Sequence, residues 1–131
     1  VYSLKSLADP DLLYIARTAE EPIGFVIALP DYNQVLKKLN GSMFPLGLLK
    51  FLWHRKKING IRSFAQFVIP SYQKKAVNSA IFYKLMLESL KKGYKYCEGS
   101  TIAEMNIDSQ RSVEGVGGRL YRIYRLYAKN L

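Results

Sequence analysis

The sequence predicts an α/β fold in which helices cover a mixed β-sheet. A leading pair of apolar, β-branched runs has the pattern of a hairpin, and strand-length apolar runs then alternate with segments of helical periodicity. With 131 residues, 49% of them hydrophobic, the chain is long enough for one domain with a buried core. We therefore expect residues 1–131 to form a single domain.

Two strands and two helices are expected in the first half of the chain. Glu20-Glu21-Pro22 forms the turn between the strands, and Asp31-Tyr32-Asn33 supplies N-cap side chains for the first helix, which stops at Asn40-Gly41. The second helix is apolar at its start and basic in its last turn, which suits the helix dipole. The strands are Leu12–Ala19 and Ile23–Leu29, the first helix follows Asp31, and the second is Leu46–Lys57.

The second half alternates strands and helices. The longest helix has apolar residues at helical spacing (Val77, Ile81, Phe82, Leu85, Met86 and Leu90) and stops at Gly93. A shorter helix is closed by Gly117-Gly118. The expected elements are strand Phe64–Ile69, helix Val77–Lys92, strand Tyr96–Ile102, helix Asn106–Gly115 and strand Leu120–Ala128.

The net charge of +10 points to an anionic partner or to a solvated basic surface. Nucleic acid, anionic lipid and a phosphorylated ligand all fit such a charge. The basic residues lie in small separate clusters rather than one continuous patch: Lys37-Lys38, Arg55-Lys56-Lys57, Lys74-Lys75, Lys91-Lys92 and Arg119-Arg122-Arg125.

Cysteine and histidine usage favours a cytoplasmic protein without a metal site. The single Cys97 excludes an internal disulfide, and in an expected strand it predicts a buried thiol. No signal peptide and no apolar run of about 18 residues is visible, so no membrane span is expected. The single His54 excludes a zinc cluster, and its place near a helix end favours a protonated imidazole.

The segment Phe64–Gly93 predicts an anion site. A strand stops at Pro70, a turn carrying Lys74 and Lys75 follows, and a long helix begins near Val77. Because a helix N-terminus carries unpaired N–H groups and partial positive charge, a pyrophosphate would be stabilised there.

Two further surfaces have several interpretations. Arg119, Arg122 and Arg125 alternate with tyrosines, as in some single-stranded nucleic-acid binders, but a period of three places them on both faces of a strand. A final strand with surface arginines explains the repeat better than a nucleic-acid platform. The apolar stretch Met43–Trp53 fits three interpretations: the core or a packing surface, a lid over an acyl group or substrate, or a helix at a membrane surface. The first is the preferred one.

Several segments, in their order, resemble a branch of the GNAT acyltransferase superfamily. They are Leu29-Pro30-Asp31-Tyr32-Asn33, Lys37-Lys38-Leu39-Asn40-Gly41 and Gly117-Gly118-Arg119-Leu120-Tyr121-Arg122-Ile123-Tyr124. The resemblance covers Leu12–Leu131 and implies a mixed, mostly antiparallel sheet flanked by helices. Because Val1–Asp11 barely represents the superfamily's first strand and helices, we expect a C-terminal part that packs on a missing N-terminal region. A sheet edge left open would also allow two copies to pair as a homodimer.

The resemblance implies a site for acetyl-CoA or another acyl-CoA as co-substrate. Gln73 matches the first position of the pyrophosphate loop, while Ala76 and Asn78 stand where the pattern has Gly and then Gly or Ala. Ala76 fits if its φ stays negative, and Lys74 and Lys75 would offset the changes by direct charge contact. The implied cofactor residues are Phe67, Val68 and Ile69 on the strand, Gln73, Lys74, Lys75, Ala76, Val77 and Asn78 in the loop and helix, and Asn106.

The sequence offers fewer candidate catalytic residues than cofactor-binding residues. Val113 stands where many members carry the tyrosine that protonates the leaving thiolate. Tyr121, or else Tyr124, is the candidate acid, provided that its side chain faces the cleft. Glu104, expected at the end of a strand, is the candidate base for an amine acceptor. The implied function is transfer of an acyl group from CoA to an amine. The alternative is an inactive GNAT-like module that binds a partner domain or nucleic acid through its basic surface.

Overall fold

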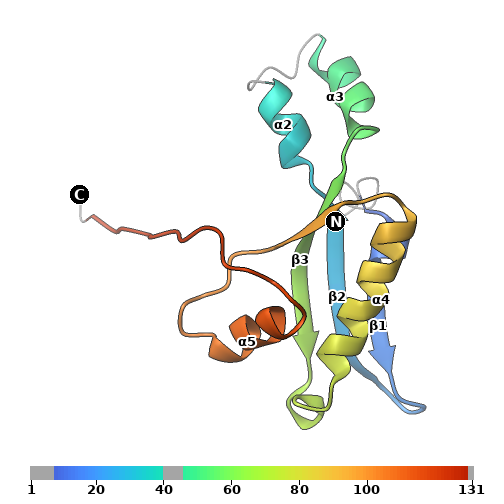
Figure 1. Cartoon of the computed structure of the whole chain (residues 1–131), viewed down its shortest axis with the longest axis vertical. Helices are drawn as coiled ribbons and strands as arrows, with labels where there is room; N and C mark the ends of the chain where they lie inside the picture. The colour runs from blue at the N-terminus through green and yellow to red at the C-terminus, as the bar shows by residue number, and fades with distance from the viewer. Residues whose placement is uncertain (1–7, 40–45, 130–131) are drawn as a thin grey trace. The chain divides into compact units, whose positions relative to one another are not determined.

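The computed structural model describes residues 8–39 and 46–129, and the chain divides after Thr101 into two units, each described here by itself. The first unit holds a four-stranded sheet with helices, and the second holds one helix (Figure 1). The elements of the first unit are η1 (Pro10–Leu12), β1 (Leu13–Arg17), β2 (Pro22–Pro30), α2 (Asn33–Leu39), α3 (Gly47–Arg55), β3 (Gly60–Val68), η2 (Pro70–Tyr72), α4 (Val77–Lys91) and β4 (Tyr96–Gly99).

The sheet is mixed and mostly antiparallel, which confirms the expected fold class. Its strands lie in the order β1-β2-β3-β4. β1 pairs with β2 and β2 with β3 in antiparallel register, whereas β3 and β4 are parallel. The β1–β2 turn is held by Thr18, whose hydroxyl oxygen accepts the N–H groups of Glu20 and Glu21. A side chain that satisfies turn amides in this way is the usual role of threonine in tight turns.

One face of the sheet packs against α4, which runs along it in Figure 1. Alternate residues of β2 (Gly24, Val26 and Ala28) are buried, as a strand with one covered face requires. The helix contributes Ile81, Phe82 and Leu85 to this core, but Met86 and Leu90 are exposed, so its buried stripe is narrower than expected. The largest fully buried side chains are those of Leu12, Val26, Val35, Ile61 and Leu85.

Helices α2 and α3 lie together beyond the end of the sheet where β2 finishes and β3 begins (Figure 1). The N–H of Asp31 donates to the carbonyl of Gly60, which joins these two strand ends. Asp31 then accepts the N–H of Asn33 at 3.2 Å, as expected of a residue that begins a helix. The ring of Tyr32 stacks on that of Phe51 in α3, with centroids 5.8 Å apart.

Several expected boundaries are corrected. β3 begins at Gly60, earlier than Phe64, and ends at Val68, because Pro70 and η2 turn the chain. β4 ends at Gly99 rather than Ile102. Cys97 is exposed rather than buried, since β4 is an edge strand. The helix stop at Asn40-Gly41 and the residues Met43 to Pro45 lie outside the described residues.

The second unit contains α5 (Ile107–Gly115) and a segment without regular structure. Asn106 caps the helix, its side-chain oxygen accepting the N–H of Ser109, and Gly117 ends it at φ +89°. The final strand expected over Leu120–Ala128 is wrong: none of these described residues is in a strand, and all are exposed. A strand needs hydrogen bonds to a neighbouring strand, and β-propensity alone does not provide one.

Candidate functional site

The two parallel strands of the sheet diverge at Ser63. β4 pairs with β3 only from Gly60 to Ser63, and the last bond runs from the N–H of Ser100 to the carbonyl of Ser63 at 3.1 Å. Beyond this point, Phe64–Val68 has no neighbouring strand on the β4 side among the described residues. The second half of β3 is therefore a backbone edge onto which an extended molecule could pair.

An irregularity at Phe64 decides which backbone groups face this edge. Ala28 of β2 lies opposite Ser63 and Ile27 opposite Ala65, so Phe64 is an extra residue in β3. The carbonyl of Ser63 faces β4, whereas the N–H of Ile69 donates to Ile23 of β2. Because backbone groups alternate sides along a strand, Gln66 and Val68 direct theirs to the open edge.

Two of the three residues expected to contact the cofactor from the strand have backbone groups that do not face the open edge. Ile69 is engaged on both sides, since its N–H donates to Ile23 and its carbonyl accepts the N–H of Tyr72. Phe67 lies opposite Phe25 and shares the orientation that turns backbone groups toward β2. Val68 keeps the expected position on the open edge, and Gln66 joins it.

The loop between η2 and α4 has a backbone shape suited to glycine, although it contains none. Lys74 has φ +60° and Ala76 has φ +59°, both in the left-handed region. The condition that Ala76 keeps a negative φ is therefore not met. A left-handed conformation costs an L-residue about 1–2 kcal/mol, and such strain clusters at functional sites.

Side chains from the loop fold back on their surroundings. The side-chain amide of Gln73 donates to the carbonyl of Val68 at 3.1 Å, which fastens the loop to the end of β3. The ammonium of Lys75 lies 5.0 Å from the centre of the Tyr72 ring. Gln73 thus fixes the shape of the loop, and the charges of Lys74 and Lys75 stay beside the start of α4.

The N-terminus of α4 is open to an anion. Ala76 is its N-cap residue, and no side chain makes a capping hydrogen bond there. The first helical residues are Val77 and Asn78, so Asn78 lies in the first turn, as expected. Uncapped N–H groups and the positive end of a helix of 15 residues stabilise a negative group, and the two lysines add to that field.

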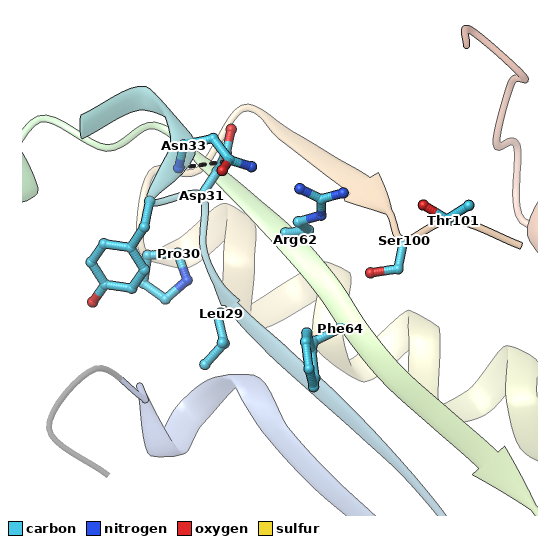
Figure 2. Close-up of a pocket in the computed structure, with 9 residues that line it drawn as sticks. Leu29, Pro30, Asp31, Asn33, Arg62, Phe64, Ser100 and Thr101 are labelled. Atoms are coloured by element: carbon cyan, nitrogen blue, oxygen red, sulfur yellow. Dashed lines mark hydrogen bonds between the residues drawn. The ribbon is translucent and has the colours of Figure 1, made fainter. Parts of the chain in front are cut away.

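A cavity of about 360 Å³ lies between the end of β2, the first half of β3 and the residues that follow β4. In Figure 2 it is bordered by Asp31 after β2, Arg62 and Phe64 of β3, and Ser100 after β4. Arg62 also pairs with Glu98, with 3.5 Å between charged atoms. The cavity joins apolar walls from Leu29, Pro30 and Phe64 to a few polar groups, which is the usual composition of a small-molecule site.

A buried carboxylate stabilises one wall of this cavity. Asp31 is 5% exposed, and one of its oxygens accepts the hydroxyl of Tyr96 at 2.8 Å. Gln34 donates to the same hydroxyl oxygen at 2.7 Å. Burial and then the bond to Asp31 raise the pKa of Tyr96, so its hydroxyl stays protonated and remains the donor.

The remaining candidates lie in the second unit. Glu104 is exposed in a turn five residues after β4 ends, and its carbonyl accepts the side-chain amide of Gln110. Asn106 caps α5, its side-chain oxygen accepting the N–H of Ser109. Tyr121 lies in the segment without regular structure, with the guanidinium of Arg122 5.4 Å from its ring centre.

His54 differs from its expected state. Desolvation, then the charges of Lys38, Lys57 and Lys50, lower the pKa of this imidazole below its usual 6.5. Its Nδ1 atom is buried without a hydrogen-bond partner. The helix C-terminus favours the protonated ring, but desolvation and neighbouring lysines outweigh it.

Sequence reasoning missed Gln66 and the cavity residues Arg62, Phe64 and Ser100. The extra residue at Phe64 carries no local signal, because a bulge appears only once two strands are paired. A signal did exist for the cavity: polar residues follow the ends of two strands, at Asp31 and at Ser100.

Comparison with known proteins finds two relatives by sequence. No protein-family model matches the chain. It is 34% identical to Protein YghO of Escherichia coli (strain K12) and 32% identical to the bacterial ceramide synthase of Caulobacter vibrioides, in each case over 98% of its length. These alignments cover 34% and 35% of the two proteins, so the chain spans about a third of their length.

Solved structures share its architecture. The aminoglycoside N-acetyltransferase AAC(6')-Iy, in complex with a CoA bisubstrate analogue, superposes with a TM-score of 0.60 at 20% identity, covering 91% of this chain and 69% of that one. TTHA1254 from Thermus thermophilus superposes with the same TM-score at 11% identity, covering 99% and 78% of the respective chains. Together with the diverging parallel strands and the loop before α4, these likenesses show that the chain has the fold of the GNAT acetyltransferase superfamily.

Proposed function

We propose that the chain binds acyl-CoA and acts in the transfer of its acyl group to an amine. The open edge of β3 that leads directly into the strained, lysine-bearing loop at α4 carries this proposal. Solved proteins of the same fold were crystallised with CoA or a CoA analogue. The relative from Caulobacter vibrioides is named a ceramide synthase, which supports an acyl transfer in its homologues.

Binding would use backbone groups on the strand and charges on the loop. Gln66 would pair with the pantetheine amides through its N–H and its carbonyl, because both face the open edge. Val68 would contribute its N–H, since its carbonyl already accepts the side-chain amide of Gln73. The first-turn N–H groups of α4, from Val77 and Asn78, would hold the pyrophosphate together with Lys74 and Lys75. With Ala76 in the left-handed region and no side chain capping the helix, these N–H groups would be available to that group.

The chemistry needs positioning and one net proton transfer. A C–N bond forms as the C–S bond of the thioester breaks, and the proton lost by the amine balances the one gained by the thiolate. Glu104 would act as the base and Tyr121 as the acid. The cavity at Arg62 and Phe64 borders the point where the strands diverge and would receive the amine, so orientation would supply much of the rate.

Calorimetric titration of acetyl-CoA into the chain tests this proposal. We expect micromolar binding that persists at moderate salt, because the strand contacts do not depend on charge. Lys74→Ala should weaken binding about tenfold, since it removes a charge beside the phosphates. Lys84→Ala removes an exposed charge farther along α4 and should leave the affinity unchanged. Undetectable binding at millimolar acetyl-CoA would reject the proposal.

A non-catalytic module is the second candidate, favoured by Val113 at the position where many GNAT enzymes carry an acidic tyrosine. Such a module would bind a partner domain or nucleic acid through its basic surface. Its signature would be RNA binding that weakens steeply with salt and is not displaced by acetyl-CoA. Acetyl-CoA binding without turnover of any amine would instead indicate a retained site without catalysis.

Several partner and location predictions belong to the same proposal. The face of the sheet opposite α4 exposes Ile15, Phe64 and Phe67. Packing of a further region of a longer protein, or of a second copy, would remove these side chains from water. A cytoplasmic location and a single-domain organisation also remain predictions.

A further inference from the structure

Helix α3 has an apolar face that the described residues leave exposed. Gly47, Phe51 and His54 form its covered side, since they are buried or half-buried. With about 100° of rotation per residue, the opposite side is an arc of about 140°. That arc consists of Leu48, Leu49, Leu52 and Trp53, all of them exposed. We call this arc the α3 apolar face.

Positive charges border the α3 apolar face. Lys50 lies on one side of the arc and Arg55 on the other. Lys56 and Lys57 follow the last turn, with the Lys57 ammonium over the Trp53 ring. Helix α2, packed beside α3, adds exposed Leu36 together with Lys37 and Lys38 in its last turn. An apolar stripe with cationic borders is the arrangement of helices that lie in a membrane interface.

The distribution of charge along the chain supports an anionic occupant. Residues 32–87 contain ten lysines and arginines and no aspartate or glutamate. Because the whole chain has a net charge of +10, the remainder is neutral. Six of these ten charges lie on or directly after α2 and α3, in residues 32–57, whereas Arg62 pairs with Glu98 and the other three belong to the loop before α4 and to α4. An apolar protein partner would explain the leucines, but it would not explain six cations without an aspartate or glutamate in residues 32–57. Anionic lipid headgroups above an apolar layer match both features.

A third feature that fits a membrane interface is the tryptophan on the α3 apolar face. Trp53 is the sole tryptophan, is exposed on the α3 apolar face, and has the ammonium of Lys57 3.5 Å from its ring centre. Indole rings concentrate at the headgroup level of bilayers, where one part of the ring is apolar and the N–H is wet. No helix among the described residues is long and apolar enough to cross a membrane. An exposed indole ring beside a lysine ammonium is suited to the headgroup level of a bilayer.

We infer that the α3 apolar face docks the chain on the surface of an anionic lipid bilayer. The leucines and Trp53 enter the boundary between headgroups and acyl chains, while the surrounding lysines contact lipid phosphates. On its covered side α3 is connected to the cavity, since Phe51 in the middle of the helix stacks on Tyr32, which also lines the cavity.

The test uses the fluorescence of the sole tryptophan, with the whole chain and two vesicle compositions. We expect a blue shift of Trp53 emission, quenched by brominated lipid, with phosphatidylcholine vesicles that contain about 30 mol% phosphatidylglycerol. Pure phosphatidylcholine vesicles should give a much weaker change. Raising the salt from about 0.05 to 0.5 M should reduce binding, because the lysine contacts are screened.

Matched variants distinguish docking through the α3 apolar face from nonspecific binding through other exposed leucines or lysines. Leu49→Glu should abolish co-flotation with the anionic vesicles, whereas Leu90→Glu on α4 should not, although the two leucines are 65% and 63% exposed. Removing two charges as Lys50→Gln and Lys56→Gln should lower the partition coefficient about tenfold. The same loss made at Lys84 and Lys129 should change it far less.

Three outcomes would overturn the inference. The first is the absence of any vesicle-dependent shift in Trp53 emission. The second is vesicle binding that Leu49→Glu leaves intact, which would assign the membrane contact to another surface. The third is a blue shift that grows with protein concentration in the absence of lipid, which would make the face a contact between two copies.

Discussion

Two residues of the loop before α4 hold a backbone shape that glycine adopts at no cost. Lys74 and Ala76 lie at φ +60° and +59°, where the Cβ of an L-residue crowds the backbone. The hydrogen bond from Gln73 to Val68 and the start of α4 fix the two ends of this loop. Ala76 and Asn78 stand where the resemblance led us to expect glycine or alanine, and the backbone at Ala76 has a conformation that glycine favours.

Ala76→Gly should stabilise the chain. Removing the Cβ relieves the left-handed strain, and we expect the free energy of unfolding to rise by about 1 kcal/mol, or about 3 °C in Tm. Chemical and thermal denaturation measure this change. The control is Ala80→Gly within α4, where glycine should instead lower stability by about 1 kcal/mol. A loss of stability at both positions would mean that Ala76 is not strained.

His54 should titrate below its usual pKa of 6.5, since desolvation and the nearby lysines disfavour the charged ring. It is the sole histidine, so its C2–H resonance follows the titration without ambiguity. Because the unfolded chain binds this proton more tightly, the free energy of unfolding should fall as pH drops below 6.5. Lys38→Gln should move the pKa upward. A wild-type pKa of 6.5 or above would contradict the described packing between α2 and α3.

At the scale of elements, the short pairing of β3 with β4 sets up the site. Tyr96 begins β4 opposite Gly60, and its ring lies where a Cβ on Gly60 would be. Its hydroxyl reaches Asp31, so one side chain joins the start of β4 to the beginning of α2. The strands separate only four residues later, beyond Ser63 and Gly99.

Gly60→Ala should destabilise the chain by about 1–3 kcal/mol, because the new methyl group would overlap the Tyr96 ring and force the two strands apart. Urea denaturation gives the free energy of unfolding. Gly99→Ala, at the other end of the same pairing, meets nothing within 4 Å and should change stability by less than about 0.5 kcal/mol. Equal effects at the two glycines would show that the Tyr96 contact does not decide the cost.

Local patterns predicted most elements, and long-range contacts account for the failures. The hairpin, α4 with its Gly93 stop, and α5 with its Asn106 cap depend on periodicity and on capping residues within a few positions, so the sequence contains their signals. The segment Leu120–Ala128 also has strand-forming residues, yet Leu126 is 99% exposed. Strand pairing joins distant parts of a chain, and neither that segment nor the bulge at Phe64 has a local signature.

At the scale of the whole molecule, the proposed binding surfaces occupy different parts of the first unit. The proposed anion site lies at the start of α4 and the cavity lies where the pairing of β3 with β4 ends. The α3 apolar face lies beyond the end of the sheet where β2 finishes and β3 begins. The proposed anion site at the loop before α4 could be predicted from the sequence, because a strand, a turn and a helix follow one another there. The cavity draws its walls from four separate segments, so only the fold reveals it.

Separate surfaces predict separable losses of function. Leu49→Glu should abolish vesicle binding and leave acetyl-CoA affinity unchanged, because the α3 apolar face shares no residue with the loop at α4. Lys74→Gly should weaken acetyl-CoA binding by loss of charge while it raises stability by relief of strain. Calorimetry, vesicle flotation and thermal denaturation of both variants measure these effects. Parallel loss of all three properties in either variant would indicate general misfolding instead.

Amide NMR during a titration with acetyl-CoA tests the central claim most directly, because it reports each backbone N–H separately. The account predicts that the largest shifts fall on Gln66 to Val68 and on residues 74–79, with β1 and α3 unchanged. Ala76→Gly should retain this pattern. An unchanged spectrum at millimolar acetyl-CoA, or shifts confined to the basic residues of α2 and α3, would contradict the assignment of an acyl-CoA site to the open edge of β3.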